Sequence, residues 1–109
     1  MTKQVFELRD LPALTVPNSL FDVRFIHTEN ITVAFNKLKA GAEVPLHEHL
    51  HETIDYVQDG DLLMQIGDEQ HIMTPGTVTK IPSHTPHAAK ALSDCTVINI
   101  FYPSRSDFG

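Results

Sequence analysis

Tryptophan is absent from this sequence of 109 residues, and cysteine occurs once, at Cys95. A single cysteine cannot form a disulfide within the chain, so the fold does not depend on an oxidising compartment. Cys95 begins an apolar segment, and we expect it to be a small buried thiol. A reactive thiol is the alternative.

Long apolar segments are also lacking. The N-terminal residues MTKQVFELRD contain no apolar core of a signal peptide. Elsewhere, no run of residues approaches the roughly 18 apolar residues of a membrane span. We therefore expect a cytoplasmic protein that does not interact with membranes.

Basic residues are few, because 8 Lys and Arg stand against 14 Asp and Glu and give a formal net charge of −6. Such a chain is repelled by nucleic acid and by anionic membranes at long range, so we expect neither as a partner. A small anionic ligand remains compatible with this charge, because a metal ion or one well-placed arginine can reverse the local field.

The length predicts one domain, at residues 1–109, since domains usually have about 100 to 150 residues. With 41% hydrophobic residues the core is feasible but thin. Folds of this size often gain stability by burying a further face against a second copy, so we expect a homodimer.

Apolar and polar residues alternate in several short segments, and no segment has the apolar spacing of an amphipathic helix. The predicted strands lie at residues 21–25, 31–36, 53–58, 62–66, 69–73, 78–81 and 96–102. Strands of this length with turns about every ten residues predict an all-β sandwich or barrel. Residues 96–102 are apolar on both faces, which predicts burial on both sides. Residues 5–16 are broken by Pro12 and bounded by Pro17, which predicts an edge strand or arm.

Histidines cluster in two places, first at His47, His49 and His51 and again at His84 and His87. In an extended chain alternate side chains point the same way, so the first three could share one face. Neutral imidazole suits Zn, Cu, Ni or Fe, which makes a metal site one interpretation. A solvated polar patch is the other.

The spacing of these residues resembles the cupin family. Its first motif is Gly, five residues, His-x-His, three or four residues, Glu or Gln, six residues, Gly. Its second is Gly, five residues, Pro-x-Gly, two residues, His. The matching positions are Gly41, His47, His49 and Gly60 in the first motif and Gly76, Pro82 and His87 in the second, where His84 replaces the internal Gly.

This resemblance implies a double-stranded β-helix, the jelly-roll barrel of the cupin fold. It also implies a divalent transition metal (Zn, Ni, Fe, Mn or Cu) held by His47, His49 and His87. Thr53 stands where the motif has its Glu or Gln ligand. We therefore expect three histidines and water around the metal, with His51 or Glu52 as the alternative fourth ligand.

The C-terminal end is similar, more narrowly, to small cupins that linearise unsaturated uronates released from pectin and alginate. Their last strand has an acid, one residue, Phe, three residues and Arg, followed by a tail of the form Arg-x-Asp-Phe. The corresponding residues are Asn99, Phe101 and Arg105, followed by Ser106, Asp107 and Phe108. An amide thus replaces the family's acid.

Together these residues predict a metal-dependent isomerase or ring-opening enzyme acting on a small, anionic sugar acid. By alternation Asp55 shares the inward face with Thr53, and we expect it to move the proton; a solvated strand residue is the alternative. The resemblance implies that Arg105 binds the substrate carboxylate. A flexible C-terminal surface residue is the alternative. The predicted substrate contacts are Phe101, as an apolar wall, with Asn99, Thr53 and Tyr56. A metal-dependent dioxygenase and a non-catalytic sugar-binding or small-molecule-binding cupin remain alternatives.

Overall fold

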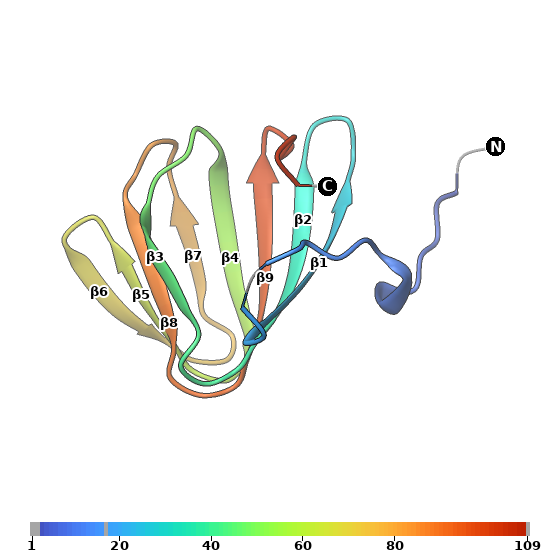
Figure 1. The fold of residues 1–109 in the computed structure, drawn as a ribbon. Coiled ribbons are helices and arrows are strands. Elements are labelled where there is room, and N and C mark those ends of the chain that lie inside the picture. Colours follow the sequence, from blue (N-terminus) through green and yellow to red (C-terminus); the bar gives the residue numbers. More distant parts are fainter. Residues whose placement is uncertain (1–2, 17, 109) are drawn as a thin grey trace.

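Two antiparallel β-sheets face each other in the computed structural model, which describes residues 3–16 and 18–108 (Figure 1). One sheet has the strand order β1-β2-β9-β4-β7 and the other β3-β8-β5-β6. The strands are β1 (Phe21–His27), β2 (Thr32–Leu38), β3 (Glu43–His47), β4 (Glu52–Asp59), β5 (Leu62–Ile66), β6 (Glu69–Met73), β7 (Val78–Ile81), β8 (His87–Ala91) and β9 (Cys95–Tyr102). The all-β jelly-roll prediction is confirmed.

The core follows from the alternation within each strand. On β4, Thr53, Asp55 and Val57 are buried while their neighbours are exposed. Most of the buried apolar side chains form one cluster between the sheets, which includes Cys95. The expectation that this thiol is buried is confirmed. Figure 1 shows the sheets converging at one end and spreading at the other, where the β3–β4 connection and the C-terminus lie.

The turn between β4 and β5 shows why the first motif ends in glycine. Gly60 has a φ of +80°, and a Cβ at this position would lie 2.0 Å from the backbone oxygen of Asp94. No side chain fits such an approach, because the obstacle is backbone. Gly60 therefore holds the β4–β5 turn against the β8–β9 turn.

The N-terminal segment forms an arm rather than a strand. Its helical content is the 3₁₀ helix η1 (Leu8–Asp10), and Ala13 makes an isolated bridge to Arg24 of β1. Pro17 lies outside the described residues. Among the described residues, no helix reaches the length and apolarity that crossing a membrane requires.

The structure differs from the predicted strands in two respects. Residues 87–91 form β8, which was not predicted because His-Ala-Ala-Lys-Ala shows no apolar alternation. On β9 one face is open, since Ile100 is 39% and Tyr102 54% exposed, so this strand is not buried on both sides. Its apolar outer face is part of the outer surface of the five-stranded sheet.

Candidate metal centre and adjoining cavity

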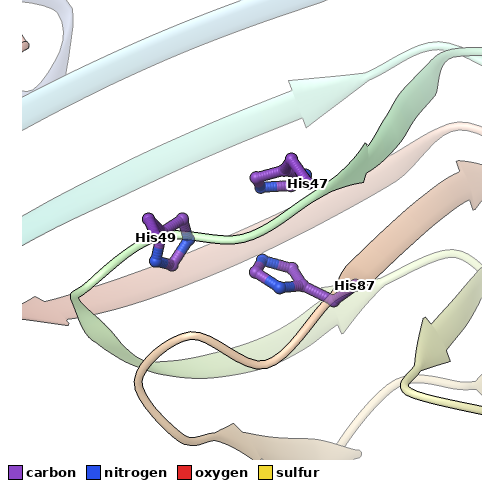
Figure 2. A group of neighbouring side chains, drawn as sticks. All are labelled: His47, His49 and His87. Atoms are coloured by element: carbon purple, nitrogen blue, oxygen red, sulfur yellow. The ribbon is translucent and has the colours of Figure 1, made fainter.

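Three histidines converge at the open end of the two sheets. His47 ends β3, His87 begins β8 opposite it in the strand register, and His49 lies in the following connection. One ring nitrogen from each lies within 4.8 Å of the others. Figure 2 shows the three rings around a common space. The structure thus brings together the three predicted metal ligands.

The backbone fixes which nitrogen each histidine presents. Nδ1 of His47 lies 2.8 Å from the carbonyl oxygen of Pro45, and Nδ1 of His87 lies 2.8 Å from that of Thr85. Nδ1 of His49 lies 3.0 Å from the carbonyl oxygen of His51. Because a carbonyl oxygen only accepts, each Nδ1 carries the proton and each Nε2 keeps a free lone pair.

Two of these histidines, His49 and His87, are held in the neutral form. Burial, and secondarily the charge of Arg105, lowers the pKa of His49 to about 4. Burial also lowers the pKa of His87. Neutral imidazole is the form that binds metal, so the donor set fits a divalent transition metal with open coordination positions.

The predicted alternatives for a fourth ligand are not among the converging donors. In the described part of the chain, that group includes neither His51 nor Glu52. Glu52 is exposed on the outer face of β4, whereas His51 lies next to the group, with its ring centre 5.5 Å from that of His49. Thr53 faces inward and is 4% exposed, and its buried Oγ1 has no hydrogen-bond partner.

A cavity of about 490 Å³ lies beside the histidines and is lined by residues of both sheets. Five of the residues predicted around a substrate line it, namely Thr53, Asp55, Asn99, Phe101 and Arg105. Tyr56 is not among the lining residues, because it lies on the outer face of β4 and is 38% exposed. The substrate-binding role predicted for Tyr56 does not fit this position.

A chain of hydrogen bonds crosses the cavity wall from β2 to β4. Asn36 Nδ2 donates to Asn99 Oδ1 at 2.6 Å and to the carbonyl oxygen of Val97 at 3.0 Å. Asn99 Nδ2 in turn donates to Asp55 Oδ1 at 2.5 Å. Sequence reasoning missed Asn36, because alternation on β2 favours Val33 and Phe35 as the buried set, whereas the structure turns Asn36 to the cavity.

Asp55 supplies the buried carboxyl group at the β4 end of these hydrogen bonds. It is 4% exposed, and burial raises its pKa from 3.8 to about 6, against the opposing effect of the hydrogen bond from Asn99. Burial without a cationic partner is costly for a carboxylate, and groups in this situation are frequent in active sites. The solvated-strand alternative for Asp55 is therefore wrong.

Arg105 is held at the cavity rather than free in solvent. Its side chain is 16% exposed, and its guanidinium carbon lies 4.8 Å from the ring centre of Phe101 and 4.5 Å from that of Phe108. Phe108 also lines the cavity. Sequence analysis assigned no role to Phe108, because its contacts depend on how the C-terminal residues turn back after β9.

Comparisons with known proteins agree with this geometry. A family model described as a cupin domain matches residues 34–101. KdgF from Halomonas sp. is similar in structure, with a TM-score of 0.87 and 28% identity over 97% of this chain and 98% of that one. An RmlC-like cupin from Shewanella frigidimarina NCIMB 400 has a TM-score of 0.88 and 19% identity over 97% and 96%.

Oxalate decarboxylase of Bacillus subtilis, a protein with Mn(II) centres, has a TM-score of 0.78 and 24% identity over 90% of this chain and 29% of its own. At this identity the likeness concerns the fold. None of the curated protein sequences matches the chain.

Proposed function

The chain belongs to the cupin family, and from that premise we propose that it is a metal-dependent isomerase or ring-opening enzyme acting on a small sugar acid. The observation that carries the proposal is one cavity that combines three converging histidines, a buried carboxyl group and an enclosed arginine. These are the groups needed to polarise an oxygen, move a proton and bind an anion.

His47, His49 and His87 would hold the metal, which when bound supplies Lewis-acid polarisation of a carbonyl or hydroxyl oxygen. The protein contributes the neutral tautomers and leaves coordination positions open to the ligand. The apolar part of the cavity wall includes Phe101, which gives the ligand an apolar surface to pack against.

Asp55 carries the proton. When a sugar hemiacetal opens, the anomeric hydroxyl loses a proton as the ring C–O bond breaks, and a proton returns to the product. Asp55 Oδ1 accepts a hydrogen bond from Asn99, and the carboxyl group takes and returns that proton. A pKa of about 6 suits this exchange near neutral pH.

Arg105 binds the carboxylate of the sugar acid. Its guanidinium lines the cavity and can donate a pair of hydrogen bonds to a carboxylate. The resemblance of the C-terminal residues to the uronate-linearising cupins supports a uronate as the substrate class. The likeness to KdgF over 97% of this chain supports a cupin domain of the same extent.

To test this, protein loaded with zinc, nickel, iron or manganese is assayed with unsaturated uronates. The readout is the loss of absorbance of the conjugated double bond. Wild-type protein should turn the substrate over, while Asp55→Asn and Arg105→Ala should each lose at least about 100-fold. Asp68→Asn, in the exposed β5–β6 turn, is the matched control. Unchanged turnover in both site variants rejects the assigned roles.

The same preparation separates the alternatives. Three histidines with open coordination positions also suit oxygen chemistry, which elemental analysis showing iron together with oxygen uptake would identify. A binding module would retain the uronate unchanged, so that titration shows binding while chromatography shows no product.

A further inference from the structure

The guanidinium of Arg105 is held by two aromatic rings and along one edge. Phe101 and Phe108 both contact it, with ring centres 4.8 and 4.5 Å from the guanidinium carbon. Along the edge, Nε donates to Asp107 Oδ1 at 2.9 Å and Nη2 donates to Asp107 Oδ2 at 2.6 Å. This forked pair constrains the plane of the group and its rotation within that plane.

The opposite end of the guanidinium keeps its donors. An arginine has five N–H groups, and Asp107 uses two of them, one on Nε and one on Nη2. In the described part of the chain Nη1 makes no hydrogen bond, so the Nη1–Nη2 end retains a second fork. That fork matches the two oxygens of a carboxylate.

The segment that carries Asp107 is itself anchored to the sheets. The backbone N–H of Arg105 donates to Oγ1 of fully buried Thr32 at 2.7 Å. The Phe108 N–H closes a turn onto the Arg105 carbonyl oxygen at 3.1 Å, and the Phe108 ring lies 5.6 Å from that of Phe25. These contacts fix residues 105–108 beside the cavity, which Arg105 and Phe108 line.

We propose that Asp107 and Phe108 are positioning residues, which aim the free end of Arg105 at the carboxylate of a ligand in the cavity. This inference rests on the proposed function only in giving Arg105 an anionic ligand. Because Asp107 neutralises much of the arginine's charge, recognition depends on the geometry of the fork more than on charge alone. Preorganisation of this kind raises affinity by reducing the ordering cost of binding.

Isothermal titration of the zinc-loaded protein with glucuronate, and with glucose as the uncharged analogue, tests the inference. Asp107→Asn should weaken glucuronate binding by about 10-fold, and Arg105→Ala by about 100-fold. Arg105→Lys should behave like Arg105→Ala, because lysine keeps the charge but not the fork. Phe108→Leu should also weaken glucuronate binding. Glucose binding should be the same in all of these variants. The control variant Asp68→Asn should bind glucuronate as tightly as the wild type does.

The double variant Arg105→Ala/Asp107→Asn distinguishes positioning from a structural role. If Asp107 acts through Arg105, the double variant binds glucuronate no more weakly than Arg105→Ala alone. A further loss in the double variant overturns the inference. So does unchanged binding in Asp107→Asn, or absence of glucuronate binding by the wild type. Tighter binding in Asp107→Asn would also overturn it, because Asp107 would then oppose the ligand rather than position Arg105.

These outcomes are separable from the proposed function. Arg105-dependent glucuronate binding without uronate turnover would reject the enzymatic proposal and leave the positioning role intact. Turnover that requires Asp55, with a KM unaffected by Asp107→Asn, would reject the positioning role alone.

Discussion

At the scale of single residues, Asp55 couples the protonation of the cavity to the stability of the fold. Burial raises its pKa from 3.8 to about 6, so the folded protein holds this proton more tightly than the unfolded chain does. One pKa unit corresponds to about 1.4 kcal/mol, so ionised Asp55 costs the fold up to about 3 kcal/mol near neutral pH. A cost of this size in a cavity wall is typical of a functional group.

Asp55→Asn should therefore stabilise the metal-free protein at pH 8 by about 2 kcal/mol. Because the folded-state pKa is raised, the proton on Asp55 stabilises the wild-type fold fully below pH 3.8. This stabilisation is lost as the pH rises through about 6. The advantage of the variant should thus disappear near pH 4. Urea denaturation of wild type and variant at both pH values measures it, and a difference that is the same at both pH values would contradict the raised pKa.

Thr53 occupies the position of a ligand without providing a suitable atom. Its side chain faces the cavity, and its buried Oγ1 has no partner. Thr53→Gln should supply an oxygen ligand and lower the zinc dissociation constant by about 10-fold. Competition with a chromogenic chelator measures the change, with exposed Thr74→Gln as control. Equal affinities would place position 53 beyond reach of the metal.

At the scale of elements, the turn between β7 and β8 carries local strain. His84, which replaces the motif's glycine, has a φ of 59°, a conformation that costs a residue with a Cβ about 1 to 2 kcal/mol. Its N–H donates to the carbonyl oxygen of His49 at 2.8 Å, so this turn joins the two histidine segments.

His84→Gly should raise the free energy of unfolding by about 1 kcal/mol, because glycine adopts this conformation without strain. Zinc affinity should not change, since His84 is outside the group of converging donors. Thermal denaturation measures the effect, and His71→Gly in exposed β6 is the control, which should destabilise. A lower melting temperature for His84→Gly would show that the imidazole contributes more than the backbone costs.

The sequence predicted most of the elements, because period-two alternation marks a strand with one buried face. It did not predict β8, where Ala88, Ala89 and Ala91 carry too little apolar contrast. The first three histidines do not share one extended face, because β3 ends at His47 and β4 begins at Glu52. Their convergence comes from the register of His47 with His87, which spacing within one segment cannot show.

The candidate site was also predictable in part. Motif spacing identified the converging histidines, and alternation identified Asp55. The roles of Asn36 and Asp107 depend on contacts that only the folded structure sets. Asn36 reaches Asn99 across the β2–β9 pair, and Asp107 reaches Arg105 after the chain turns beyond β9.

At the scale of the whole molecule, the outer face of the five-stranded sheet presents an apolar surface across adjacent strands. Ile54 pairs with Ile100, and Tyr56 pairs with Ile98. Ile54 is 46%, Ile100 39% and Tyr56 38% exposed. The neighbouring positions Val33 and Phe35 of β2 extend the patch. Apolar side chains that cluster on an exposed face are common at protein–protein interfaces.

The N-terminal arm adds to the same side of the molecule. Arg24 Nη1 donates to the carbonyl oxygens of Arg9 and Leu11, at 2.9 and 3.0 Å, which holds the arm at the edge of this sheet. Val5 is 83% and Phe6 42% exposed, and Figure 1 shows the arm projecting away from the sheets. We propose that two copies associate through these outer faces around a two-fold axis, with the arms covering part of the interface.

Size-exclusion chromatography with light scattering should give twice the chain mass of 12.2 kDa for the wild type. Ile54→Asp should give the monomer, because each dimer would bury two unpaired carboxylates. Ile72→Asp is the matched control, since Ile72 is 63% exposed on β6 of the other sheet, and it should remain dimeric. Because Ile54 points away from the cavity, the monomeric variant should still bind zinc, which separates loss of the interface from loss of the fold. A wild-type mass of one chain, or dissociation by Ile72→Asp alone, would place the interface elsewhere or remove it.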